Sequence, residues 1–101
     1  VVSMRPMPLK KEIKAVEVTG RYPRAHGAPI HWGDPTAIGI ENLAQPDFGT
    51  PTSFTHQEVP MFWACGVTPQ TVMMESKPAF AITHSPGHMF VTDLRDEDLM
   101  S

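Results

Sequence analysis

The chain has 101 residues, a formal net charge of −3, eleven prolines and one cysteine. A chain of this length forms one small domain, and an acidic balance without a basic cluster argues against a nucleic-acid partner. One cysteine cannot form an internal disulfide, which fits a reducing compartment and predicts a cytoplasmic protein. No apolar run approaches the roughly 20 residues that span a bilayer, so we expect no membrane contact.

The chain opens on an apolar stretch. Residues 1–4 predict a strand, and Pro6 and Pro8 are expected to end it because proline cannot donate to a strand ladder. The opening reads as the middle or end of a strand, and no initiator methionine precedes it. We therefore expect the sequence to be a piece of a longer chain.

A helical pattern follows. Leu9, Ile13 and Val16 fall at i, i+4 and i+7, which places them on one face of a helix. Lysines and a glutamate take the other face, and we interpret them as exposed to solvent. Gly20 is expected to end this helix.

The segment 26–40 contains a first strand-to-helix junction. Residues 30–32 predict a short strand, and Asp34 precedes a proline as the N-cap of a single helical turn. His31 and Asp34 lie close together at this junction. We predict both as substrate-binding residues, with a purely capping role for Asp34 as the alternative.

A second junction carries the only cysteine. Residues 61–64 predict a buried strand that ends at Cys65; Gly66 follows, and Thr68 with the next proline opens a helix that Thr68 is expected to cap. A helix N-terminus favours a thiolate or a bound carboxylate, and open α/β sheets bind ligands beyond the carboxyl ends of strands. We predict Cys65 as catalytic and Gly66 and Thr68 as substrate-binding. The alternative is that Cys65 is a small buried hydrophobe.

The rest of the chain predicts one more helix and two more strands. The helix runs from 69 to about 76 and stops before Pro78, strands cover 80–83 and 89–92, and a turn at 84–88 joins them as a hairpin. Strands that alternate with short helices are typical of an α/β domain. We predict an α/β fold with a mixed sheet and short helices, as a fragment of a larger α/β protein.

His84, His88 and Asp93 could support acid–base chemistry near pH 7. Either histidine supplies a general acid or base, and Asp93 could orient it; a Cys65 nucleophile with a histidine base uses the same residues. His84 and His88 are four apart, as in helical zinc motifs, but a Pro-Gly pair between them is incompatible with a helix. A hairpin could still place both rings on one side, so a zinc-dependent hydrolase is an alternative. We predict no metal and no cofactor, and the lack of phosphate-binding glycine motifs disfavours nucleotides.

Five stretches in series carry a family resemblance: VVSMRPMP, RYPRAHGAPIHWGDPTAIGI, QPDFGTP, VPMFWACGVTPQ and AFAITHSPGHMFVTD. Together they closely resemble the hydro-lyase family that includes D-glutamate cyclase, and they cover nearly the whole chain. Members of that family are longer. The resemblance implies that residues 1–101 are the C-terminal portion of a single α/β protein whose N-terminal portion is absent.

The resemblance also implies a reaction: addition or removal of water on a small amino or hydroxy acid. In the cyclase member, D-glutamate closes to 5-oxo-D-proline. In such a scheme His84 or His88 serves as base and acid, Cys65 or the N–H groups after it hold a carboxylate oxygen, and Asp34 takes the substrate ammonium. A small-acid binding module without turnover is the alternative function. The partners implied are a small carboxylic or amino acid and the absent N-terminal portion, and a homo-oligomer stays open.

Overall fold

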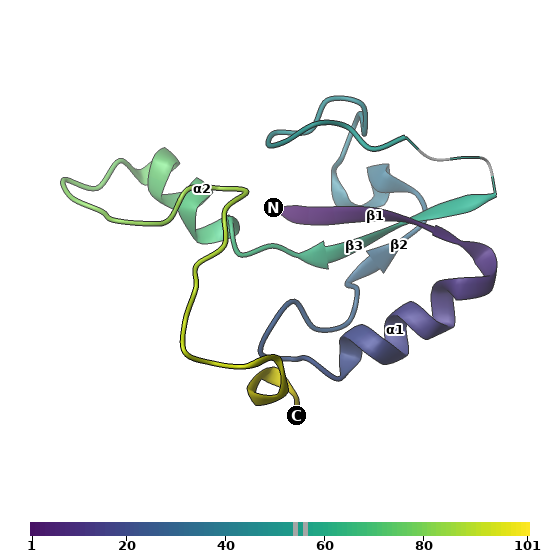
Figure 1. Ribbon diagram of the computed structural model, residues 1–101. Coiled ribbons are helices and arrows are strands. Elements are labelled where there is room, and N and C mark those ends of the chain that lie inside the picture. Colours follow the sequence, from purple (N-terminus) through teal and green to yellow (C-terminus); the bar gives the residue numbers. More distant parts are fainter. Residues whose placement is uncertain (54, 56) are drawn as a thin grey trace.

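The computed structural model describes residues 1–53, 55 and 57–101, and a three-stranded sheet organises them (Figure 1). The order is β1 (Val2–Pro8), β3 (Glu58–Ala64) and β2 (His31–Trp32), with β3 in the centre. Both described pairings are antiparallel. Sheet and short helices together confirm the α/β class, but the predicted mixed sheet was wrong for the described residues, because every strand that pairs there runs antiparallel to its neighbour.

Strand β1 runs further than the sequence predicts. It continues through Pro6 and Pro8, which lie opposite Pro60 and Glu58 of β3, so the expectation that these prolines end the strand was wrong. The reason is position. β1 is an edge strand, where a missing N–H disturbs the sheet least.

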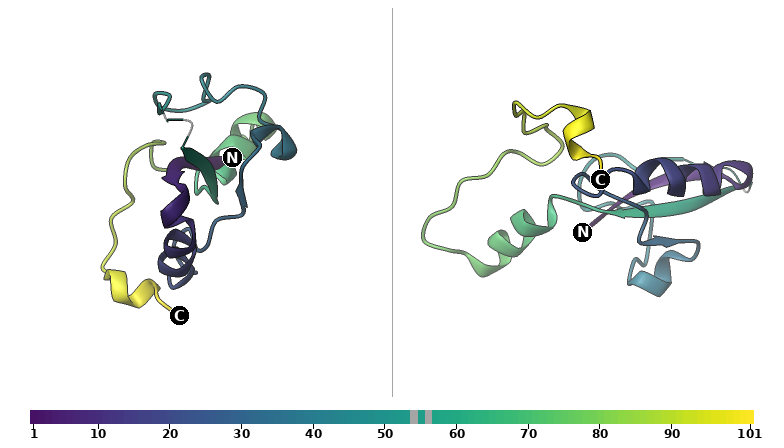
Figure 2. Two further views of the ribbon diagram at one scale, coloured as in Figure 1. Left: turned by 90° about the vertical axis from the view of Figure 1, so that its right-hand side faces the viewer. Right: turned by 90° about the horizontal axis from the view of Figure 1, so that it is seen from below.

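The predicted first helix is present as a 3-10 turn, Leu9–Lys11, that continues into α1 (Glu12–Gly20). Helix α1 covers one face of the sheet, while the segment 33–53 passes over the other (Figures 1 and 2). The apolar face expected from the sequence lies open: Leu9 and Ile13 are 62% and 76% exposed, and Val16 is half-buried. The buried hydrophobic core of the described residues is small and lies in β3, at Met61, Phe62 and Trp63.

Helix α2 (Thr68–Ser76) follows β3 and extends beyond the end of the sheet (Figure 1). It ends as predicted before Pro78, at Lys77, whose φ of 50° is left-handed. This conformation is destabilising for a non-glycine residue because Cβ crowds the following carbonyl oxygen.

Lys77 therefore gives a stability prediction. Lys77→Gly should raise the free energy of unfolding by about 0.5–1 kcal/mol, because glycine adopts a left-handed C-cap without that crowding. Ser76→Gly, one residue earlier inside the helix, is the matched control and should lower it by a similar amount, roughly 0.5–1 kcal/mol. Urea unfolding followed by circular dichroism measures both. A change in the free energy of unfolding of the same sign in both variants would contradict the left-handed C-cap at Lys77.

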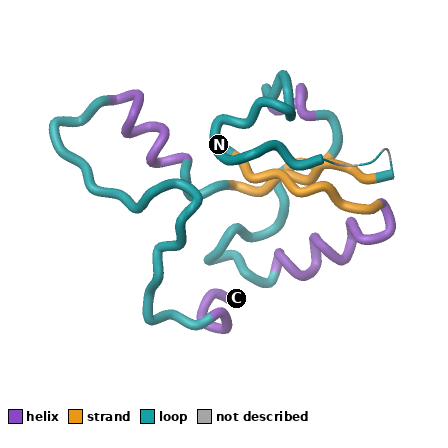
Figure 3. The backbone as a smooth tube through the Cα atoms, turned by 45° about the horizontal axis from the view of Figure 1, so that its top comes forward, coloured by secondary structure: helices purple, strands orange, loops and turns teal. Residues whose placement is uncertain are grey.

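The two strands predicted at 80–83 and 89–92 are not formed; this expectation was wrong. A long loop leaves α2 and passes through both runs before it reaches a 3-10 helix, Asp96–Leu99 (Figure 3). The turn between the runs is present, with the His88 N–H donating to the Ser85 carbonyl oxygen at 3.1 Å. A strand needs a neighbour for its backbone groups, and among the described residues these runs have no ladder partner.

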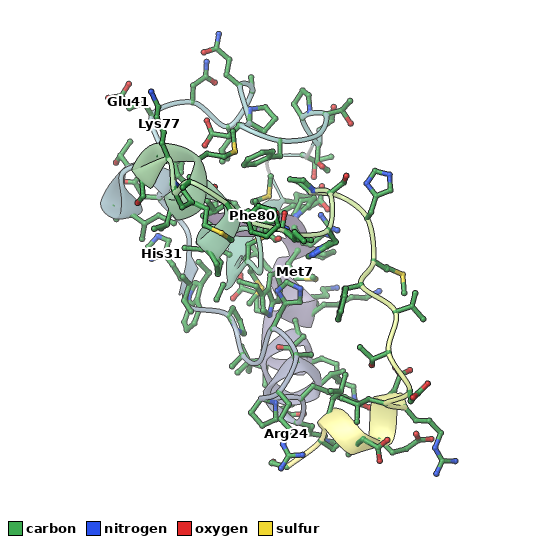
Figure 4. The ribbon with its side chains drawn as sticks, turned by 90° about the vertical axis from the view of Figure 1, so that its left-hand side faces the viewer. Met7, Arg24, His31, Glu41, Lys77 and Phe80 are labelled. Carbon is green, nitrogen blue, oxygen red and sulfur yellow. The ribbon has the colours of Figure 1, made fainter. Side chains whose placement is uncertain are left out.

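The C-terminal 3-10 helix packs beside the end of α1. The Ser101 N–H donates to the Arg21 carbonyl oxygen at 3.2 Å, and the Arg24 guanidinium reaches the Asp98 carbonyl oxygen at 3.4 Å (Figure 4). Within residues 1–53, 55 and 57–101, no helix has the length and apolar character required to cross a bilayer.

Candidate functional site

Cys65 lies where the sequence places it, directly after β3 and just before α2. It is half-buried, and its N–H donates to the Val1 carbonyl oxygen at 3.3 Å. The Val67 N–H donates to Sγ at 3.5 Å. Gly66 and Val67 form the turn into the helix. Backbone groups of Val1 and Val67 therefore hold Cys65 at the end of the central strand.

Thr68 has a different role from the one predicted. Its hydroxyl lies 2.9 Å from the Cys65 carbonyl oxygen and 3.0 Å from the Val1 carbonyl oxygen, and donates its single hydrogen to this pair. The N-cap residue is Val67, without a side-chain cap, so the expectation that Thr68 caps α2 was wrong. The physical reason is that Thr68 already stands inside the helix and its hydroxyl reaches back to acceptors. It ties the junction to the start of β1.

A buried glutamine links α2 to the His84 turn. Gln70 is 6% exposed, and its Nε2 donates to the His84 carbonyl oxygen at 2.7 Å while lying 3.3 Å from His84 Nδ1. Because a carbonyl oxygen can only accept, this contact fixes which end of the amide faces His84, and the second amide hydrogen can reach Nδ1. A neutral His84 then carries its own hydrogen on Nε2. The ring is also 6.0 Å from that of Phe90.

Gln70 was not predicted from the sequence as a site residue. The residue stands in the stretch WACGVTPQ, and its separation of fourteen residues from His84 gave no local signal of a contact. Its Oε1 atom is buried and has no hydrogen-bond partner among the described residues. Gln70 therefore joins two of the stretches that carry the family resemblance.

His31 and Asp34 lie at the other predicted junction, and the cap there is confirmed. Asp34 Oδ1 accepts from the Thr36 N–H at 3.0 Å and from its hydroxyl at 2.8 Å, at the start of a 3-10 helix, Pro35–Ile38. His31 Nε2 donates to the Asp34 carbonyl oxygen at 2.8 Å, and its ring lies 5.7 Å from that of Phe62. Binding of substrate by either residue stays a prediction.

The cap changes the titration of Asp34. The Thr36 hydroxyl, and then its backbone N–H, hold the pKa of this carboxyl below its ordinary value; slight desolvation opposes them, and the His31 charge adds a smaller lowering. Because the folded-state pKa is depressed, the cap contributes stability above the unfolded-state pKa. That contribution is lost as the pH falls through the folded-state pKa.

We expect this loss to be visible at one amide. The Thr36 amide resonance should move in an acid titration followed by NMR, with a midpoint below that of an unstructured aspartate, and Asp34→Asn should abolish the movement. The internal control is the Ala44 N–H, which donates to Oδ1 of the uncharged Asn42 side chain at 2.9 Å. A midpoint at the unstructured value would show that the carboxylate is not held by Thr36.

His88 and Asp93 lie on the exposed loop beyond His84. His88 Nδ1 donates to the Pro86 carbonyl oxygen at 3.2 Å, and both side chains are exposed. Within the described part of the chain, no hydrogen bond joins either of them to Cys65. The structure thus brings Cys65, Thr68, Gln70 and His84 to the start of α2, while their predicted partners lie on other segments.

A groove that the sequence did not predict lies between α1 and the sheet. Its volume is about 510 Å³. Trp63 of β3 lines it, and His26 at its edge contacts the Ala64 carbonyl oxygen, one residue before Cys65. The other lining residues come from β1 and the first helical segment: Ser3, Arg5, Met7, Lys11, Lys14, Ala15, Val18 and Thr19. Two lysines interpreted as part of a solvated face therefore border an apolar groove together with an arginine.

Metal ligands do not gather anywhere in residues 1–53, 55 and 57–101: no group of three or more His, Cys, Asp or Glu side chains could hold an ion there. Zinc sites in proteins use three or four such ligands. At the start of α2 the structure places a thiol, a hydroxyl, an amide and an imidazole.

Comparison with known proteins gives the family. The model of the D-glutamate cyclase family matches residues 1–93. The chain belongs to the D-glutamate cyclase family. All four residues gathered at the start of α2 lie inside the matched region. The resemblance seen in the sequence is thereby confirmed.

Relatives in bacteria carry a related name. Proteins named "Putative hydro-lyase" are 63% identical in Stutzerimonas stutzeri (strain A1501) and 64% identical in Thermoanaerobacter sp. (strain X514), each over 98% of this chain. The protein named "Putative hydro-lyase YcsI" in Bacillus subtilis (strain 168) is 59% identical over the same share. The matched region is only 37–38% of each relative, so this cyclase-family chain spans little more than a third of their length.

Proposed function

We propose that this chain is the C-terminal portion of a lyase that removes or adds water on a small amino or hydroxy acid. Closure of D-glutamate to 5-oxo-D-proline is the first candidate reaction. Family membership and the names of the relatives support a hydro-lyase. The observation that carries the site is the bond from Gln70 to His84, because it holds an imidazole against the helix that follows Cys65.

The reaction defines what the site must do. The substrate ammonium loses one proton, the amine attacks the side-chain carboxyl carbon, and the nitrogen then loses a second proton as a C–N bond forms and a C–O bond breaks. The departing oxygen takes up two protons in all and leaves as water. The site therefore needs a base for the amine, an acid for the leaving oxygen and donors that polarise the carboxylate.

In our assignment, His84 is a hydrogen-bond donor that polarises the carboxylate. When Gln70 occupies Nδ1, the hydrogen of a neutral His84 is on Nε2, which faces away from the amide and can donate a hydrogen bond to a carboxylate oxygen. The acid is His88, once it has taken the proton of the amine. Cys65 and the N–H group of Gly66 hold the carboxylate. The hydroxyl of Thr68 has donated its hydrogen to the backbone, so it can only accept from the substrate.

The remaining predicted residues complete the scheme. His88 takes the proton of the amine, and Asp93 orients that ring. Asp34 pairs with the substrate ammonium, and His31 supports the Asp34 backbone through its 2.8 Å bond. These roles require the loop that carries His88 and Asp93 to approach Cys65 when the substrate is bound.

Turnover is best tested in a protein that is as long as the relatives. We would place these 101 residues in the matched region of the Stutzerimonas stutzeri relative and incubate the hybrid with D-glutamate, L-glutamate and a panel of small hydroxy acids. Product is followed by NMR. Formation of 5-oxo-D-proline, or dehydration of one hydroxy acid, is the expected result. A folded hybrid that binds none of them and converts none would refute the lyase proposal.

The groove favours a second candidate function, a small-acid binding module without turnover. Arg5, Lys11 and Lys14 are three cations around an apolar floor, a composition suited to an organic anion. Calorimetric titration of the same acids into the unsubstituted protein and into Arg5→Gln distinguishes the binding module from the lyase. Binding that Arg5→Gln abolishes, with no product from the intact protein, supports the module. Binding with turnover that survives this substitution supports the lyase.

A further inference from the structure

We propose that residues 80–83 and 89–92 are docking strands, which pair with β-structure in the N-terminal portion of the longer chain. The inference depends on the proposed placement of this chain as a C-terminal portion. It goes beyond the proposed function because it assigns a surface and its occupant, which no feature of the reaction requires.

The first observation is exposure. Phe80 and Ile82 are each 81% exposed, and Met89, Phe90 and Val91 are 87%, 74% and 80% exposed. Four of these five are more exposed than any other large hydrophobic side chain of the described residues, and only Ile13, at 76%, exceeds Phe90. Single exposed hydrophobics are ordinary in proteins, but five within residues 80–91 favour a surface that binds a partner.

The second observation is the residue pattern. Phe80 and Ile82 alternate with Ala81 and Thr83, which suits a strand with one covered face. In the second run Met89, Phe90 and Val91 are consecutive and apolar, which suits a strand covered on both faces. Neither run contains glycine or proline.

The third observation concerns the backbone. Both runs are irregular and solvent-exposed, and they lie outside the three-stranded sheet. Strand formation by such residues requires hydrogen bonds from a neighbouring strand, because the pairing is not local. The side chains are those of strands, so the missing component is the neighbour.

The length of the relatives indicates the occupant. Because the matched region is only 37–38% of each relative, most of a chain of that length lies outside these residues. Exposure is also spread over Leu9 and Ile13 of the first helical segment, which a twofold contact through residues 80–92 alone would leave uncovered. The N-terminal portion is therefore favoured over a second copy of this chain.

Docking would also fix the site. The two runs flank the turn that carries His84 and His88, and Figure 3 shows this loop leaving α2 without a neighbouring strand. Pairing of both runs would hold that turn from two sides. The contact from Gln70 to His84 would then be one of several restraints on the imidazole.

Hydrogen exchange tests the proposal directly. We would compare amide exchange at 80–83 and 89–92 in the 101-residue chain with exchange at the same residues in the full-length hybrid with the Stutzerimonas stutzeri relative. The expected result is fast exchange in the short chain and at least 100-fold slower exchange in the hybrid. The amides of α2 serve as the internal reference in both proteins.

Side-chain variants in the hybrid test which faces of the two runs are covered. Ile82→Ser should lower the thermal midpoint by about 5–10 °C, because a covered aliphatic side chain is lost. The matched control, Thr83→Ser on the opposite face, should leave it unchanged. Phe90→Ser and Val91→Ser should both lower it, because that run is covered on both faces.

Two results would overturn the proposal. One is equally fast exchange of both runs in the hybrid. The other is protection of both runs in the short chain at high concentration, together with a dimeric mass in light scattering, which would assign the surface to a second copy. Exchange is independent of activity: protected runs without turnover would refute the proposed function alone, and turnover with unprotected runs would refute docking alone.

Discussion

Phe62→Ala should unfold a large fraction of the 101-residue chain. Phe62 is fully buried in the central strand, lies opposite Met4 of β1 and packs beside the His31 ring at 5.7 Å. Truncation of a buried phenylalanine costs about 3–5 kcal/mol. Domains of this size are stable by only about 5–15 kcal/mol, and one with so few buried hydrophobic side chains belongs at the lower end. Urea unfolding followed by circular dichroism measures the loss.

Val72→Ala is the control for that variant. Val72 stands on α2 and is 53% exposed, so its truncation should change the free energy of unfolding by less than about 1 kcal/mol. Similar unfolding midpoints for Phe62→Ala and the unsubstituted chain would show that β3 is not the core of the fold.

Cys65→Ala and His84→Gln should each reduce turnover by the hybrid about 10²–10³-fold, the range expected for loss of one group that polarises the reacting carboxylate. His84→Gln keeps a polar side chain of similar length but lacks the imidazole Nε2 donor. Kinetics with the substrate identified in the screen measure kcat and KM separately. A fall in kcat at constant KM would assign the residue to the chemical step.

The two variants should not be additive. If both groups act on one carboxylate in one step, the double variant Cys65→Ala/His84→Gln should be little slower than the worse single variant. Gln45→Ala, an exposed loop residue, is the control for a neutral substitution. Full activity of Cys65→Ala would show that Cys65 is a small half-buried hydrophobic residue without a catalytic role.

Local signals in the sequence predicted the local elements well. The strand that ends at Cys65, the helix after it and the Asp34 cap all depend on neighbouring residues: a short apolar run, a proline in the first helical turn and an aspartate before a proline. Each of these features is decided within a few residues, so no knowledge of the tertiary fold is needed.

Features that depend on distant residues could not be predicted. Pro6 and Pro8 continue β1 because that strand lies at the edge of the sheet, which the sequence does not state. Residues 80–83 and 89–92 have strand-forming side chains but no described neighbour to pair with. The groove beneath α1 also depends on how the helix lies over the sheet, which periodicity cannot specify.

The candidate site was predicted as a set of residue types and only in part as an arrangement. Cys65, Gly66 and Thr68 are adjacent in sequence, so their proximity was expected. The link from Gln70 to His84 spans fourteen residues and passes through a buried amide, for which no motif was available. How His88 and Asp93 relate to Cys65 stays a prediction, because the loop that carries them is exposed.

The candidate site depends most on the contact that holds His84 against the start of α2. Its most direct test is a nuclear Overhauser measurement on the isotope-labelled 101-residue chain. We predict cross-peaks between the side-chain amide hydrogens of Gln70 and the Cε1 hydrogen of His84, with slow exchange of those amide hydrogens. A freely exchanging Gln70 amide without cross-peaks to the imidazole would contradict the account.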